Sequence, residues 1–116
     1  MADDSNNGDD VMFVYMGGDQ RVPRNVRYVR VHKSVKIITE RAFYYCKHLV
    51  SIEMHDGVEI IEPGAFSGCS SLSRIKLSGV RVIGEFAFDN CTALEDVEFG
   101  DKLETIGEYA FRSKGK

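Results

Sequence analysis

Apolar residues recur along the chain at a nearly constant interval, and this period is the strongest pattern in the sequence. Four phenylalanines are separated by 23, 22 and 23 residues, and each directly follows an alanine: Phe43, Phe66, Phe88 and Phe111. A cysteine column and a leucine column keep the same interval, at Cys46, Cys69 and Cys91 and at Leu49, Leu72 and Leu94. A period of this size, with apolar residues fixed to it, indicates stacked supersecondary units that bury their faces against each other.

Each repeat consists of three short pieces. In the copy at residues 49–72, the alternation of apolar and polar residues predicts a first strand with Ile52 and Met54 pointing inward. After a turn, a second extended piece places Val58 and Ile61 inward. The third piece is predicted to be a short helical or 3₁₀ turn, since Pro63 suits a first helical position.

The two ends of the chain depart from the repeat. Residues 1–10 are polar and acidic, which predicts a disordered tail. Residues 11–25 are expected to form an N-terminal cap, with a β-prone stretch at 11–16, a turn at Gly17-Gly18-Asp19 and a returning strand at 20–22. We expect a hairpin or a pair of short strands there. The stack of repeats is expected to cover residues 26–111, and residues 112–116 form a C-terminal tail.

The repeated motif resembles that of a known family. Ala-Phe-x-x-Cys-x-x-Leu, followed by Ile-x-Met or Ile-x-Leu and then Val-x-x-Ile, is similar to the BspA-type leucine-rich repeat over about residues 26–111. The resemblance implies a right-handed solenoid used for binding proteins or host surfaces. The fold class expected is therefore an α/β repeat of about four coils. Parallel β-strands would form one face, with short strands, turns and 3₁₀ or α turns on the other.

Composition narrows the possible partners. The net charge of the 116 residues is −3, and four aspartates lie in the first ten residues, so the repeats are close to neutral. A near-neutral surface produces no strong positive potential that would attract nucleic acid or an anionic membrane, and we expect neither as a partner. No apolar run approaches the roughly 20 residues of a membrane span, and the N-terminus does not resemble a signal peptide, which predicts a cytoplasmic or nuclear protein. The cysteines share one column, which predicts buried, reduced thiols.

Charged residues also follow the repeat. The outward column of the first strands alternates in sign, Arg30, Glu53, Lys76 and Glu98, and so does that of the second strands, Lys36, Glu59, Arg81 and Glu104. Opposite charges across neighbouring strands contribute about 0.2–1 kcal/mol each. Two interpretations stay open. The columns could set the register of the strands, or the first column could bind a ligand.

The first strands carry the candidate binding residues. Two further outward columns flank the charges and make a flat surface of mixed polarity on rigid strands, which suits a folded partner or a peptide. The candidate partner-binding residues are Tyr28, Arg30, His32, Ser51, Glu53, His55, Arg74, Lys76, Asp96 and Glu98.

The sequence offers no constellation for catalysis, a metal or a cofactor. His32 and His55 are expected to be neighbours, but their column holds no third strong ligand, and zinc needs three or four. Cys46 precedes Lys47-His48, yet its column points inward, which favours a buried thiol over a nucleophile. We therefore expect no enzyme, no metal and no cofactor.

Two functions remain. The first is a non-catalytic protein-protein interaction module that binds a protein partner through its parallel-sheet face. The alternative is a structural segment of a longer repeat protein, or a unit that self-associates end to end. It rests on an apolar C-terminal edge expected from Val97, Phe99, Leu103, Ile106 and Phe111.

Overall fold

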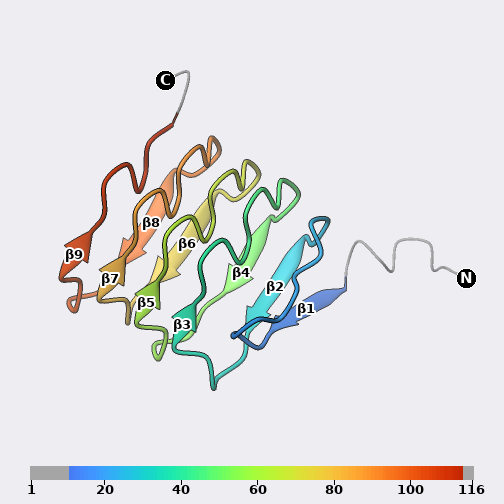
Figure 1. The fold of residues 1–116 in the computed structure, drawn as a ribbon, viewed down its shortest axis with the longest axis horizontal. Helices are drawn as coiled ribbons and strands as arrows, with labels where there is room; N and C mark the ends of the chain where they lie inside the picture. The colour runs from blue at the N-terminus through green and yellow to red at the C-terminus, as the bar shows by residue number, and fades with distance from the viewer. Residues whose placement is uncertain (1–10, 114–116) are drawn as a thin grey trace, which may run out of the picture.

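The structure, a computed structural model, describes residues 11–113. The acidic tail expected at 1–10 and residues 114–116 of the expected C-terminal tail lie outside the described residues. The described chain forms a solenoid of about four coils built from short parallel strands (Figure 1). The strands are β1 (Met12–Tyr15), β2 (Tyr28–Val31), β3 (Ile37–Ile38), β4 (Ser51–Glu53), β5 (Ile60–Ile61), β6 (Arg74–Leu77), β7 (Val82–Ile83), β8 (Asp96–Phe99) and β9 (Thr105–Ile106).

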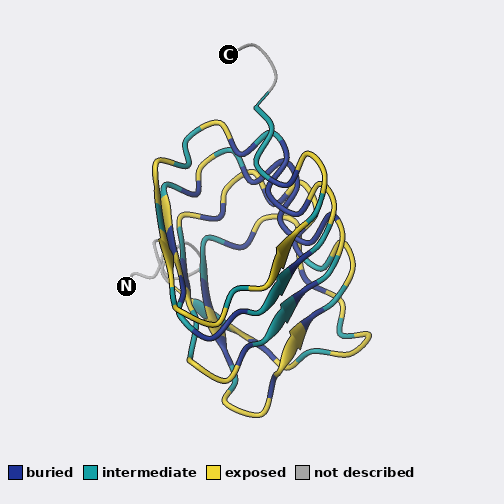
Figure 2. Ribbon diagram, turned by 90° about the vertical axis from the view of Figure 1, so that its left-hand side faces the viewer, coloured by how far each residue is buried: buried dark blue, intermediate teal, exposed yellow. Residues whose placement is uncertain are grey.

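The strands occupy two sides of the solenoid. The first side holds β1-β2-β4 and then β6-β8, and its outward surface is called the first face; the second side holds β3-β5-β7-β9, and its outward surface is the second face. The paired strands are parallel and join residues one period apart, so Val29 lies opposite Ile52 and Ile61 lies opposite Ile83. The same columns therefore turn inward in successive coils, and Figure 2 shows buried positions along the inside.

The third side is a ladder of turns, called the turn ladder, at residues 40–46, 63–69, 85–91 and 108–112. The prediction of a helical or 3₁₀ turn here is wrong, because the described residues contain no helix. Residues with positive φ recur in every coil of the ladder, as at Arg41 (56°) and Tyr45 (54°), and a left-handed backbone cannot continue a right-handed helical turn. Backbone N–H groups reach the next coil instead: Phe43 N donates to Ala65 O at 2.7 Å.

The N-terminal hairpin expected from the sequence is also wrong. β1 pairs with β2 in parallel, with Met12 opposite Tyr28, and residues 20–22 form no strand. Parallel neighbours need a crossover connection rather than a tight turn. Residues 16–27 supply it, and they bury Val22 and Val26 against the core as a shortened coil. β1 thus covers the N-terminal end of the first sheet.

The centre of the core is a stack of phenylalanine rings. Neighbouring ring centroids are 5.1 Å apart from Phe43 to Phe66 and from Phe66 to Phe88, and 5.0 Å apart from Phe88 to Phe111. The planes of these pairs differ by only 4°, 4° and 2°. Tyr15 packs on the N-terminal end of the stack at 5.0 Å. One ring per coil thus fills the interior.

We expect Phe66→Ala to lower the free energy of unfolding by about 3–5 kcal/mol, because it opens a cavity between two stacked rings. Urea denaturation followed by circular dichroism measures the change. Phe99→Ala is the matched control, since Phe99 is 42% exposed and its loss should cost less. Equal losses in the two variants would contradict a central role for the ring stack.

Candidate functional site

The first face brings the predicted charge column together. Arg30 lies opposite Glu53 in the strand register, and its Nε donates to Glu53 Oε1 at 3.1 Å. Lys76 lies opposite Glu98, and Arg74 lies opposite Asp96. Within residues 11–113, no ion pair holds Arg74 or Lys76. Two exposed cations are therefore available on the C-terminal half of this face.

The first face is interrupted between β4 and β6. These strands are neighbours, yet they belong to separate hydrogen-bonded sheets. A hollow of about 280 Å³ lies at this break, with Ile52 and Ile75 among its lining. Its polar lining comes from half of the candidate residues predicted from the sequence: Ser51, Arg74, Lys76, Asp96 and Glu98. The break itself has no sequence signal, because it depends on how two distant strands pair.

The remaining candidates lie outside this hollow. Tyr28 is partly buried and lies under the guanidinium of Arg27, which is 5.9 Å from the ring centroid. Sequence reasoning missed Arg27, whose position just before β2 gave no signal. Arg30 and Glu53 form their ion pair on the N-terminal half of the face.

The two histidines are neighbours, as predicted, and both stabilise turns. His55 Nε2–H donates to His32 O at 3.0 Å, and Gly57 N donates to His55 Nδ1 at 3.0 Å. Ser34 N donates to His32 Nδ1 at 3.1 Å. Among residues 11–113, no three His, Cys, Asp or Glu side chains gather as a metal site would require.

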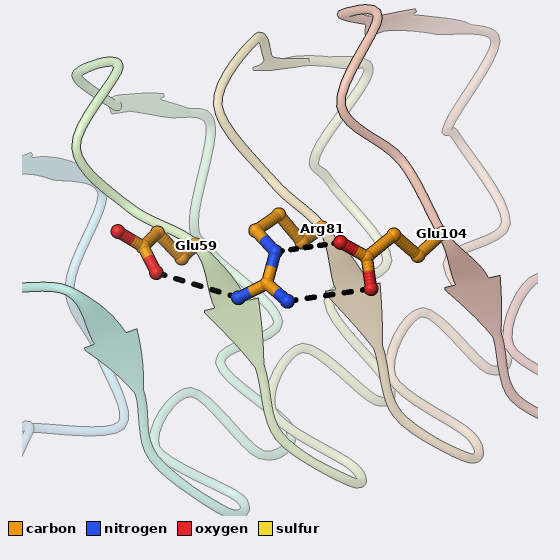
Figure 3. A network of polar contacts seen from close by, with 3 residues as sticks. All are labelled: Glu59, Arg81 and Glu104. Carbon is orange, nitrogen blue, oxygen red and sulfur yellow. Dashed lines mark hydrogen bonds and ion pairs between the residues drawn. The ribbon is translucent and has the colours of Figure 1, made fainter.

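The second face carries a network of three charges (Figure 3). Arg81 Nε donates to Glu104 Oε2 at 2.8 Å and its Nη2 to Glu104 Oε1 at 3.3 Å, while Nη1 lies 3.7 Å from Glu59. The hydrogen bonds to Glu104 raise the pKa of Arg81, and those from Arg81 lower the pKa of the Glu104 carboxyl. Alternating charges therefore form ion pairs on both faces, as expected if they help to set the register.

The cysteine column is buried, as predicted. Cys69 Sγ donates to Phe43 O at 3.1 Å and Cys91 Sγ to Phe66 O at 3.0 Å, so each thiol bonds to the preceding coil. Burial raises the pKa of all three thiols, that of Cys91 to about 12. A buried thiol with a raised pKa is a poor nucleophile at neutral pH, and this applies to Cys46 beside His48.

Parallel strands repeated at this period define a leucine-rich-repeat solenoid. The chain belongs to the BspA type leucine rich repeat family, of which six copies match residues 23–116. A leucine-rich repeat protein from Bacteroides ovatus is similar with a TM-score of 0.77 and 28% identity, over 90% of this chain and 29% of that one. The T. pallidum leucine rich repeat protein TpLRR is similar with a TM-score of 0.69 and 36% identity, over 72% of this chain and 40% of that one.

The matched part of this chain thus covers less than half of either solved relative, 29% of one and 40% of the other. Comparison with curated protein sequences finds no match. No helix capable of spanning a membrane occurs in the part of the chain that the structure describes.

We expect the buried thiols to make stability fall at high pH. An unfolded thiol ionises near pH 8.5, whereas burial keeps Cys91 protonated to about pH 12. Its contribution is therefore complete below about pH 8.5 and is lost as the pH rises toward 12, with a slope of about 1.4 kcal/mol per pH unit.

Urea unfolding of the wild type and Cys91→Ala between pH 8 and 10.5 measures this slope. The variant should have a shallower pH dependence, whatever its stability at pH 8. Identical slopes for the two proteins would contradict the assignment.

Proposed function

We propose that this chain is a non-catalytic interaction module that binds a protein partner through the first face. Leucine-rich repeat domains generally serve in protein interaction or as structural elements. The observation that supports a binding role is the hollow at the β4–β6 break. It joins an apolar floor to charged and polar groups, the usual mixture in a binding site.

The size and charge of the hollow limit what it accepts. At about 280 Å³ it suits one or two side chains of a partner rather than a large cofactor. Arg74 and Lys76 lie opposite Asp96 and Glu98 in the register, so cations and carboxylates run side by side. A partner with paired acidic and basic side chains complements this arrangement. Rim charges of this kind govern association rate and specificity.

The proposal includes a reducing cellular compartment, the cytoplasm or the nucleus, as expected from the sequence. The three cysteines are free and buried in the structure. Free thiols of this kind are common in proteins of reducing compartments.

We expect Arg74→Glu/Lys76→Glu to reduce capture of the partner from a native lysate by at least about tenfold, because two attractive charges become repulsive. Lys36→Glu/Lys102→Glu is the control, since it changes the net charge equally at positions outside the hollow. Quantitative mass spectrometry of captured proteins gives the ratio, and thermal melting confirms that both variants fold. Equal capture by the two variants would refute binding through this face.

A second candidate is a structural role, with association through the C-terminal end. β8 and β9 are the last strands of their sheets, and Phe99 in β8 and Ile106 in β9 are 42% and 49% exposed. Val97, Leu103 and Phe111 are only partly buried against the core. An edge with apolar side chains and open backbone groups is a surface for another strand.

If this edge associates, sedimentation analysis should show oligomers that grow with protein concentration. Ile106→Lys should shift them to monomer, because a charge on an edge strand opposes pairing. Val50→Lys, at a similarly exposed residue away from that edge, should leave them unchanged. A wild-type protein that stays monomeric at millimolar concentration would exclude this candidate.

A further inference from the structure

The turn ladder contains a gap in a column of large side chains. The first positive-φ position of successive coils holds Arg41 (56°), Gly64 (69°), Phe86 (59°) and Tyr109 (59°). Gly64 alone lacks a side chain, so the surface is hollowed at its coil. We call this hollow the notch. It lies on the third side of the solenoid, away from the first face.

The notch has aromatic and acidic walls. Its volume is about 340 Å³, and the residues that form its walls and floor include Glu40, Arg41, Tyr44, Gly64, Glu85 and Phe86. Tyr109, in the next coil, stacks on Phe86 with the ring centroids 5.3 Å apart. The Phe86 ring therefore bounds the notch and packs against a second ring. The stem of Arg41 crosses Gly64, where an added Cβ would lie 3.2 Å from Arg41 Cγ.

The adjoining coil shows what such walls bind. The guanidinium of Arg112 lies 5.3 Å from the Phe86 ring centroid and 4.7 Å from that of Tyr109. Its Nε donates to Asp89 Oδ1 at 3.0 Å and its Nη2 to Asp89 Oδ2 at 3.2 Å. This surface therefore already holds one guanidinium between aromatic rings and the carboxylate of Asp89, whose side chain is only 11% exposed.

The notch repeats these groups one coil away. Phe86 and Tyr44 supply rings, and Glu40 and Glu85 supply carboxylates that the Arg112 pairing leaves available. Among residues 11–113, Arg41 is the one cation in the lining, and its guanidinium lies 5.4 Å from the Tyr44 ring. The charge of the lining therefore favours a cationic occupant.

We propose that the notch binds an arginine side chain from an extended segment of a partner protein. Arginine fits better than lysine because its planar guanidinium stacks on rings and donates to carboxylates in the same plane. The notch is separate from the hollow of the first face, so a partner could use either surface or both.

The test is a titration of the ¹⁵N-labelled protein with N-acetyl-arginine methylamide, followed by amide chemical shifts. We expect saturable shifts centred on Gly64, Ser67 and Phe86, with a dissociation constant on the order of 1–10 mM for a single side chain. The citrulline analogue, which is neutral and of similar shape, should bind at least about fivefold more weakly. Absence of saturation, or equal binding of citrulline, would overturn the proposal.

Two variants locate the site. Gly64→Asn fills the notch with a residue that tolerates positive φ, and Arg41 can move aside, so binding should fall about tenfold. Gly18→Asn is the matched control, because Gly18 also has positive φ (61°) and an added Cβ there meets nothing within 4 Å.

Glu85→Gln removes one carboxylate without adding volume and should weaken binding severalfold. Unchanged affinity in a folded Gly64→Asn protein would overturn the proposal. If that variant does not fold, the arginine–citrulline comparison and Glu85→Gln still decide it.

Discussion

The spacing of the phenylalanine stack constrains the whole molecule. Rings 5.0–5.1 Å apart, with nearly parallel planes, match the roughly 4.8 Å between hydrogen-bonded strands, so ring stacking and strand pairing impose the same rise per coil. A coil that lost its ring would leave a void that neighbouring backbones, bonded across the turn ladder, could not close. The other columns follow from this rise. Thiols bond to the carbonyls of the preceding coil, and equivalent surface side chains of neighbouring coils are separated by one strand spacing.

The short distance between equivalent side chains of neighbouring coils explains the alternation of charge. Identical charges in neighbouring coils would face each other at one strand spacing, which is unfavourable. Arg30 with Glu53, and Arg81 with Glu59 and Glu104, form ion pairs instead. Exposed pairs contribute little stability, so avoiding repulsion in the correct register is their larger effect. Arg74 and Lys76, beside the β4–β6 break, have no such ion pair among the described residues, and this distinguishes the hollow from the rest of the first face.

Period and alternation were enough to predict which side chains are inside, because packing in each coil repeats that of its neighbours. Ile52, Ile61, Phe66 and Cys69 are buried as expected. The helical turn was wrong because its backbone depends on bonds to the next coil and on positive φ at residues such as Phe86, which carry no glycine signal. The hairpin was wrong because a Gly-Gly-Asp turn fits a coil corner equally well. The break that forms the hollow depends on how β4 and β6 pair, and these strands are distant in sequence. No pattern in the sequence predicts it.

The notch and its walls have one origin. A residue with a Cβ at positive φ costs about 1 kcal/mol or more relative to glycine, so Gly64 is the unstrained choice at its position of the coil. Phe86 and Tyr109 occupy the same position with strain, and their rings stack on each other and on Arg112. Strain of this kind persists only where surrounding contacts offset it, and it gathers at functional sites. The turn ladder places Phe86 and Tyr109, whose backbone is strained, next to an unstrained glycine, and this creates a notch with an aromatic wall. Arg112 shows which side chain such a wall holds.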